Sequence, residues 1–221
     1  MEDVLDWYAE PYDGRRPQVC FDESPVQLLS ETRHPLPARP GQPAQYDYEY
    51  RREGTANLFL FVQPLRGWRH VNITARRTKY DFAVQMQELV DVQFPEADVM
   101  RLVVDNLNTH TPAALYETFA PAEARRITRK LALHYTPKHG SWLNMAECAF
   151  AVLTGQCLDR RIPHIAALCQ AIAAWQAARN HNKTKINWRL NTTDARLTLK
   201  RLYPSASGEE RLPERERMQA A

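Results

Sequence analysis

Glycine is scarce in this sequence, which has only seven among its 221 residues. A glycine-rich loop that cradles phosphates needs several glycines close together, so a nucleotide-binding loop of that kind is not expected. No stretch approaches the ~18 consecutive apolar residues that a membrane-spanning helix requires. The first ten residues carry acids where a secretory signal peptide would carry lysines. We therefore expect a cytoplasmic protein with no membrane partner.

The spacing of the cysteines gives no sign of a disulfide framework or a zinc site. The four cysteines form no C-x-x-C pair, and three of them fall in a segment with helical periodicity: Cys148, Cys157 and Cys169, with Cys20 far away. Paired cysteines at short spacing are the usual sign of structural zinc, and disulfides belong to oxidising compartments. The sequence predicts reduced, mostly buried thiols, without disulfides or structural zinc.

The composition is that of a folded globular chain, with 44% hydrophobic and 25% charged residues and a mean hydropathy of -0.55. Charge is unevenly distributed, however. Residues 1–120 hold 12 Lys and Arg against 18 Asp and Glu, a net charge of -6, whereas residues 121–221 hold 17 against 8, a net charge of +9. A basic half favours a polyanionic partner such as nucleic acid, and an acidic half can supply metal-binding carboxylates. An unevenly charged, solvated surface is the alternative.

Hydrophobic periodicity and turn residues predict the order of the elements. Residues 1–16 are polar and are predicted to be a loose N-terminal arm, and residues 33–45, with four prolines, an extended loop. Breaks are expected at Glu53-Gly54 and Arg66-Gly67. Strands are predicted at 18–23, 46–50, 55–62, 68–74, 99–104 and 131–135, and helices at 78–94, 113–130 with a split at Pro121, 144–158, 164–180 and 192–202.

This order begins antiparallel and then alternates strand and helix. It predicts an α/β protein with a mixed sheet and helices on both faces, of which the ribonuclease H-like fold is one arrangement. We expect the folded domain to span residues 17–203 and residues 204–221 to be a polar C-terminal tail.

Three acids stand out by position. Asp22 ends an apolar strand, Asp105 follows the buried strand, and Glu147 lies in the first turn of a helix. If those two strands are parallel neighbours, the two aspartates meet at one edge of the sheet. Crowded carboxylates repel unless a divalent cation neutralises them, and oxygen ligands suit Mg²⁺ or Mn²⁺. Each acid also has a plainer explanation: the aspartates can start turns, and Asn144 with Glu147 resembles a capping box.

The motifs around these acids resemble those of a known family. Val104-Asp105-Asn106-Leu-Asn-Thr-His110 and Gly140-Ser-Trp-Leu-Asn-x-x-Glu147 are similar to the second and third acidic motifs of bacterial insertion-sequence transposases of the mariner-like (six-thirty) group, and Phe21-Asp22-Glu23-Ser24 resembles the first. The resemblance implies a ribonuclease H-like DDE catalytic domain. It implies Asp22, Asp105 and Glu147 as metal-binding catalytic residues, with Glu23 as the rival of Asp22.

The same resemblance implies the chemistry. Such enzymes cut DNA at the element's ends by hydrolysis and join the freed 3'-hydroxyl to target DNA, using Mg²⁺, with Mn²⁺ as a substitute and two ions in the site. A homodimer on DNA is expected, because two DNA ends must be brought together. Asn106, His110 and Asn144 are supporting residues of the site. For His110 a purely structural role is the alternative.

Two features depart from the family pattern. The 42 positions from Asp105 to Glu147 exceed the compact spacing usual in this group, and only 21 residues precede Asp22, too few for a helix-turn-helix DNA-binding region. The sequence thus suggests either a catalytic half with a separately encoded helix-turn-helix partner or a truncated copy.

Basic and aromatic residues near these motifs are candidates for DNA binding, because cations contact phosphates and aromatic rings stack on bases. A solvated basic face, and for Trp142 a hydrophobic staple at the helix start, are the alternatives. The candidates are Lys138, His139, Trp142, Arg125, Arg126, Arg129, Lys130, Arg160 and Arg161.

Two rival functions follow from the same residues. A metal-dependent nuclease of the same fold would cut DNA without joining ends. A non-catalytic DNA-binding remnant of a transposase would bind DNA without cutting it.

Overall fold

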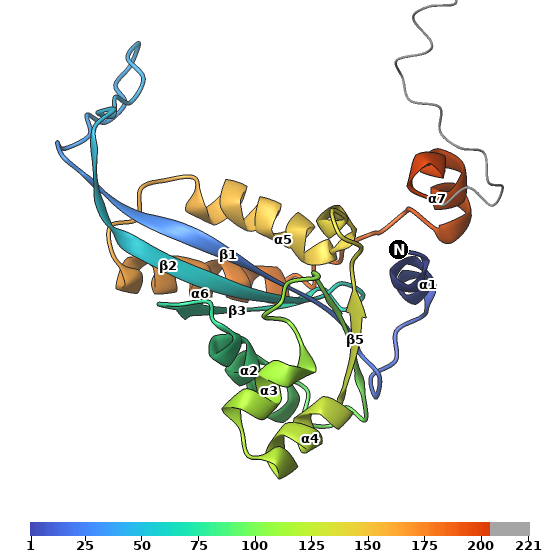
Figure 1. Ribbon diagram of the computed structural model, residues 1–221. Helices are drawn as coiled ribbons and strands as arrows, with labels where there is room; N and C mark the ends of the chain where they lie inside the picture. The colour runs from blue at the N-terminus through green and yellow to red at the C-terminus, as the bar shows by residue number, and fades with distance from the viewer. Residues whose placement is uncertain (204–221) are drawn as a thin grey trace, which may run out of the picture. The chain divides into compact units, whose positions relative to one another are not determined.

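A five-stranded mixed sheet lies at the centre of the larger of two compact units, residues 1–188 (Figure 1). The structure is a computed structural model and describes residues 1–203, so the predicted tail at 204–221 lies outside the described residues. The strand order is β3-β2-β1-β4-β5. The first three strands are antiparallel, and β4 and β5 run parallel to β1, which makes the sheet mixed, as the sequence predicted. The strands are β1 (Gln18–Glu31), β2 (Tyr50–Gln63), β3 (Trp68–Thr74), β4 (Met100–Val104) and β5 (Leu131–Tyr135).

Helices cover both faces of this sheet (Figure 1). One face carries α2 (Lys79–Glu88) with its π-helical end η1 (Leu89–Gln93), α3 (Pro112–Thr118) and α4 (Pro121–Arg129). The other carries α5 (Met145–Leu153), its π-helical end η3 (Thr154–Leu158) and α6 (Ile165–His181), preceded by the short 3-10 helix η2 (Ser141–Leu143). The second unit, described over residues 189–203, contains α7 (Thr192–Thr198) and η4 (Lys200–Leu202).

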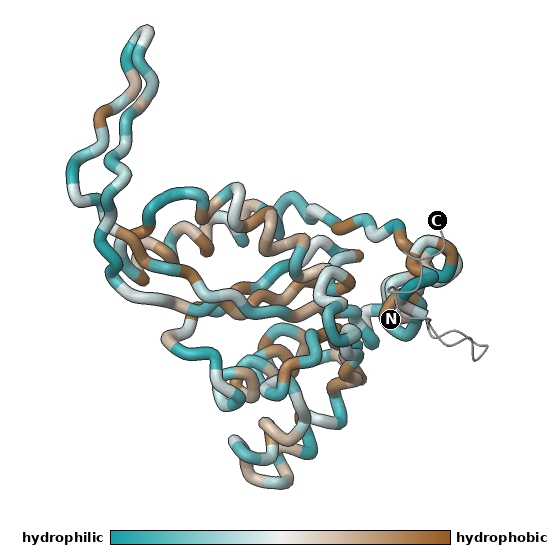
Figure 2. Tube along the Cα trace, turned by 45° about the horizontal axis from the view of Figure 1, so that its top comes forward, coloured by the Kyte–Doolittle hydropathy of each residue, from teal (hydrophilic) through white to brown (hydrophobic). Residues whose placement is uncertain are grey.

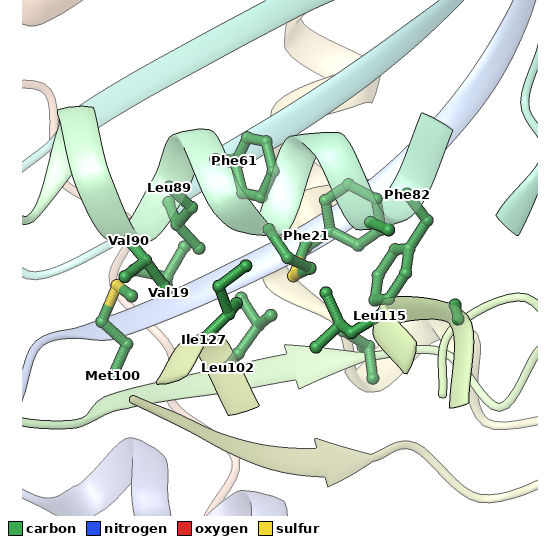
Figure 3. Close-up of a cluster of buried hydrophobic side chains, with 14 of the residues drawn as sticks. Val19, Phe21, Phe61, Phe82, Leu89, Val90, Met100, Leu102, Leu115 and Ile127 are labelled. Atoms are coloured by element: carbon green, nitrogen blue, oxygen red, sulfur yellow. The ribbon is translucent and has the colours of Figure 1, made fainter. Parts of the chain in front are cut away.

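Alternation along the strands separates two hydrophobic cores. Phe21 lies at the centre of the first, where its ring is 4.9 Å from that of Phe61 and 5.6 Å from that of Phe82 in α2 (Figure 3). Leu60 and Val62 of β2 face the opposite way and pack under α5 and α6. Residues 56–63 of β2 are buried on both faces, so this half of the strand is a largely apolar run rather than an alternating one, whereas residues 50–55 are exposed.

The N-terminal segment is helical where the sequence predicted a loose arm. Helix α1 spans Glu2–Ala9 and buries Val4, Leu5 and Tyr8. Val4 and Tyr8 pack against Cys20 of β1 and the first residues of α5. Arg101 of β4, only 2% exposed, forms an ion pair with Glu10 and lies over the Trp7 ring at 4.9 Å. The prediction missed this helix because its few apolar positions stand among acids.

β1 and β2 are longer than the predicted strands and form one hairpin, and the separate strand predicted at 46–50 does not form. β1 continues past Glu23 to Glu31, and β2 begins at Tyr50, so the hairpin projects beyond the helices with a largely hydrophilic tip (Figure 2). The break predicted at Glu53-Gly54 is instead a β-bulge inside β2, where the register shifts opposite Leu28 and Leu29. Gly54 has φ +134°, a conformation that glycine adopts without strain.

The cysteines and the helices test two further predictions. All four cysteines are free, but Cys148 and Cys169 are exposed, so the prediction of mostly buried thiols is wrong for these two. Within residues 1–203, every helix is too short or too polar to cross a membrane.

Candidate active site

The two aspartates lie level with each other on neighbouring strands. β1 and β4 pair in parallel, with Gln18 opposite Arg101 and Cys20 opposite Val103. Continuing that register by two residues brings Asp22 opposite Asp105, which directly follows β4. The parallel pairing on which the sequence-based expectation depended is therefore present, and it brings these two acids to one edge of the sheet.

Glu147 approaches the same edge from α5. Strand alternation places Asp22 on the face of Cys20, and Cys20 packs against Met145 and Ala146 at the start of α5. Glu147 lies in the first turn of that helix and is exposed. Both other carboxylates act on Asp22: its pKa is raised to about 7, chiefly by burial and also by the negative charges of Asp105 and Glu147, against a hydrogen bond from the Glu23 amide.

Glu23 points to the opposite face of β1, so it does not join this group. Its side chain is 5% exposed and lies 3.4 Å from His110 Nε2. The other ring nitrogen of His110, Nδ1, is hydrogen-bonded to Asp105. The His110 ring is fully buried and packs against Phe21 and Phe82. His110 thus lies between Asp105 and Glu23 and contacts both carboxylates.

The charge of His110 follows from these partners. Burial alone would lower its pKa, but the hydrogen bonds with Asp105 and Glu23 outweigh burial and raise the pKa to about 9. At neutral pH His110 is therefore protonated and donates from both ring nitrogens. Its positive charge also favours the ionised form of Asp22.

Asn144 fixes α5 against β1. It is fully buried, its side-chain amide donates to the Phe21 carbonyl at 2.7 Å, and its side-chain oxygen accepts from the Ala146 amide at 3.1 Å. It therefore caps the helix, as the sequence predicted. Among the hydrogen bonds of residues 1–203, none returns from the Glu147 side chain to Asn144, so the predicted reciprocal capping box does not form. The Glu147 carboxylate is left facing solvent.

The turn before α5 presents three of the predicted DNA-binding residues at the surface. Lys138 and His139 are exposed, and His139 adopts the left-handed conformation with φ 66°. Trp142 is 43% exposed, whereas Leu143, which directly precedes the cap, is buried. Leu143 therefore holds the hydrophobic position at the helix start, and the staple interpretation of Trp142 does not hold.

Helix α1 supports this turn from below, and sequence reasoning missed it. The Tyr8 hydroxyl donates to the Leu143 carbonyl at 2.9 Å and accepts from the Met145 amide at 3.4 Å. Burial raises the Tyr8 pKa well above its usual value, so the hydroxyl stays protonated. The Gly-Ser-Trp-Leu-Asn turn is held between β1 and α1.

The basic cluster of α4 lies away from the carboxylates. The Lys130 carbonyl accepts from the Met100 amide at the start of β4, at the opposite end of the strand from Asp105. Arg126 is engaged by two acids, Asp91 at 2.7 Å and Glu123 at 2.6 Å, and the Lys130 ammonium donates to the Pro95 carbonyl. Arg125 and Arg129 are exposed. These four residues remain candidates for DNA only at a distance from the acids.

Arg160 and Arg161 differ from each other in their surroundings. Arg161 is bonded to Glu31 and to the carbonyls of Asp47 and Glu49, so it anchors the base of the hairpin. Arg160 is exposed, as is Asn106 beside Asp105. The structure thus brings Asp22, Asp105, Glu147 and His110 together, with Asn144 supporting them, and spreads the remaining candidates.

The chemistry of the site suits a divalent cation. Three carboxylates approach one another, and the pKa of Asp22 is raised by burial and, to a smaller extent, by the negative charges of the other two. Within residues 1–203, no three His, Cys, Asp or Glu side chains already meet in a ligand arrangement. Carboxylate oxygens are suitable ligands for a hard divalent cation. The three side chains would have to move closer together to coordinate it.

Comparison with known proteins bears on this arrangement. A sequence profile described as DDE superfamily endonuclease matches residues 17–169, which include all three acids. No curated protein matches the chain in sequence.

Solved structures of similar fold include complexes of the Mos1 mariner transposase. The Mos1 mariner paired end complex with Mn matches with a TM-score of 0.58 at 18% identity, over 83% of this chain and 54% of that one. The Mos1 Strand Transfer Complex matches with a TM-score of 0.56 at 14% identity, over 85% of this chain and 60% of that one. The mariner Mos1 paired end complex with Mg matches with a TM-score of 0.53 at 18% identity, over 83% and 56%. The ribonuclease H-like fold predicted from the sequence is confirmed, and the chain spans a little over half the length of these proteins.

Proposed function

Since the chain belongs to the DDE superfamily of endonucleases, we propose that it is the catalytic domain of a DNA transposase. Its activity would be divalent-metal-dependent cleavage of DNA at an element's ends, followed by transfer of the 3'-hydroxyl strand into target DNA. The observation that carries this proposal is the approach of three carboxylates to one edge of the sheet, with Asp22 and Asp105 on the neighbouring parallel strands β1 and β4 and Glu147 in the first turn of α5.

We assign metal binding to these three carboxylates. Mg²⁺ or Mn²⁺, as one or two ions, would supply activation of the attacking water or hydroxyl and stabilisation of the leaving oxygen. The Mos1 complexes with Mn and with Mg support the use of such ions. Asp22 rather than Glu23 takes the first position, because Asp22 lies on the face covered by α5 and Glu23 on the other.

The remaining residues of the site position and hold the substrate. His110 orients Asp105, and Asn144 sets the distance between α5 and β1. Lys138, His139 and Trp142 are exposed on the turn that leads into the helix of Glu147, and we propose that they contact the cleaved DNA strand. Asn106 would shape the same edge. Arg125, Arg129 and Arg160 would contact DNA phosphates further away, and Arg126, Arg161 and Lys130 only if their present partners release them.

The partners proposed are DNA at the element's ends, target DNA, and a second copy of the chain on DNA. The Mos1 matches, named as paired-end and strand-transfer complexes, support DNA as a partner. A separately encoded helix-turn-helix protein remains a proposal, and the cytoplasmic location stays a prediction.

The test is nicking and joining of a labelled duplex that carries the element's end, in Mg²⁺ or Mn²⁺. The purified chain should yield a joined product that Asp105→Asn abolishes and that the exposed control Asp159→Asn leaves unchanged. Cutting without joining would make the protein a nuclease of the same fold. Activity only after addition of a helix-turn-helix partner would make it half of a split enzyme, and DNA binding without any cutting would make it a remnant.

A further inference from the structure

A basic and aromatic cavity lies at the turn between β2 and β3, outside the proposed active site. Its volume is about 590 Å³, within the range of ordinary ligand pockets. Three cationic side chains and three rings line it, together with smaller polar groups: Arg66, Lys183 and Lys185, and Tyr12, Trp68 and Phe94.

Backbone contacts hold the two basic segments together. The Ile186 amide donates to the Pro64 carbonyl at 3.2 Å. Gly67, with φ +70°, packs so closely that a Cβ there would lie 2.4 Å from the Lys183 carbonyl carbon. Lys183 itself adopts the left-handed conformation at φ 46°. Such backbone strain outside glycine is uncommon and is often found at functional positions. The cations are therefore gathered by the fold rather than scattered by chance.

The charge of this cavity is not compensated by the protein. None of its lining residues, all within residues 1–188, is acidic. Arg66, Lys183 and Lys185 form no ion pair among the described residues, in contrast to Arg126 and Arg161. The cavity therefore offers an anion three unpaired cations.

The rings give this cavity a second property. Arg66 lies over the Tyr12 ring at 5.8 Å, and Trp68 packs edge-on against Phe94 at 4.9 Å. Tyr12 is 45% exposed. A groove that combines cations for phosphates with exposed rings for bases is the arrangement found in proteins that bind single-stranded nucleic acid.

We propose that the cavity formed by Arg66, Lys183, Lys185 and Tyr12 binds a single-stranded segment of DNA, with phosphates against the cations and one base stacked on Tyr12. This contact lies apart from the carboxylates. Leu60 of β2 is paired with Asp22, whereas the turn that carries the cavity follows Gln63, three residues and ~10 Å further along the strand. This site extends the proposed function, because it gives the domain a second DNA-binding site, but binding there does not depend on cleavage.

The experiment measures affinity for a short fluorescein-labelled single-stranded oligonucleotide by anisotropy, in EDTA. Lys183→Ala/Lys185→Ala should weaken binding by roughly tenfold at low salt and lower the slope of log affinity against log salt by about 1.4, since each lost phosphate contact is worth about 0.7. The double variant Arg39→Ala/Arg52→Ala removes the same charge from the β1–β2 hairpin and should change little.

The base contact is tested with an oligonucleotide that carries abasic sites. Tyr12→Ala should weaken binding of the ordinary oligonucleotide and leave binding of the abasic one unchanged. Equal losses in the cavity and hairpin double variants, or losses confined to duplex DNA, would overturn the proposal. Because binding is measured in EDTA, where metal-dependent cleavage cannot occur, failure of this site and failure of the catalytic proposal are separate outcomes.

Discussion

The side-chain amide of Asn144 donates to the carbonyl of Phe21 across 2.7 Å, which ties the cap of α5 to the residue before Asp22. This one buried side chain therefore links the helix that carries Glu147 to the strand that carries Asp22. Its oxygen is occupied by the Ala146 amide, so Asn144 serves both as a cap and as a bridge between strand and helix.

Replacement of Asn144 separates these two roles. Asn144→Ala removes both bonds and leaves the Phe21 carbonyl without its donor, so unfolding free energy should fall by about 2–4 kcal/mol. Asn144→Asp keeps the cap but faces a carbonyl with a carboxylate, and should be no more stable than the alanine variant. Urea denaturation measures both. Thr78→Ala, which removes the cap of α2 alone, should cost only about 1 kcal/mol. If all three variants cost the same, the bridge to Phe21 contributes nothing.

The pKa of Asp22 predicts a dependence of stability on pH. Its ordinary value is 3.8, and burial raises it to about 7 in the folded chain. Between these values the folded state holds a proton that the unfolded chain has lost, so this group's contribution to stability falls as pH rises from about 4 to 7. Asp22→Asn should therefore stabilise the metal-free protein at pH 8 and make little difference at pH 4.

Urea midpoints in EDTA at the two pH values measure this effect, with exposed Asp159→Asn as the control. Added Mn²⁺ should raise the midpoint of the wild type at pH 8 and not that of Asp22→Asn, because an ion that binds only the folded state stabilises it. A pH-independent difference in urea midpoint between the two proteins would show that the pKa of Asp22 is not raised in the folded state.

His110 should govern how well Asp105 holds an ion. Its ring is fixed by Phe21, Phe82 and Glu23 and is bonded to Asp105. Residues that orient a metal ligand typically cost 10- to 100-fold in metal affinity or activity when replaced. We expect a loss of that order in His110→Ala and a partial recovery in His110→Gln, which keeps a donor. Mn²⁺ binding by calorimetry is the measurement.

The matched control is His70→Ala. Like His110, His70 is bonded to a carboxylate, Glu88 at 2.8 Å, and packs against a phenylalanine ring, that of Phe61, although its own ring is only partly buried. It lies on β3, away from the three acids, so its loss should lower stability without changing Mn²⁺ affinity. A change in Mn²⁺ affinity of equal size in both variants would mean that His110 acts only through the fold.

Sequence alone predicted the core of this arrangement. The alternation at 18–23 and the apolar run at 99–104 are local patterns, and they predict the strands that lead to Asp22 and Asp105. Parallel pairing of these strands then places the two aspartates side by side. Local patterns also found the cap at Asn144. They did not find α1, whose buried Val4, Leu5 and Tyr8 are too few to show helical periodicity among acids.

Long-range contacts account for most of what the sequence concealed. Strand alternation puts the adjacent residues Asp22 and Glu23 on opposite faces, but only the packing of α5 and of His110 shows which of the two faces Glu147. Arg161 looked like a free cation because its acid, Glu31, lies 130 residues away along the chain, and one of the two acids that bind Arg126, Asp91, lies 35 residues away.

Gly67 holds together the cavity proposed to bind single-stranded DNA, and its replacement tests that geometry. At φ +70°, alanine is strained, and its Cβ would meet the Lys183 backbone at 2.4 Å. Gly41 has nearly the same conformation, φ +78°, with nothing within 4 Å of its Cβ position. Gly41→Ala should therefore cost about 1 kcal/mol from conformation alone, and Gly67→Ala clearly more, because backbone must move. Urea denaturation gives both costs in unfolding free energy, and the difference between them measures the cost of the clash.

The same two variants also test DNA binding. In Gly67→Ala the shift of Lys183 should weaken binding of the single-stranded oligonucleotide, while Gly41→Ala should bind it normally. Equal costs and equal binding in the two variants would show that the turn and the Lys183 segment are not packed together.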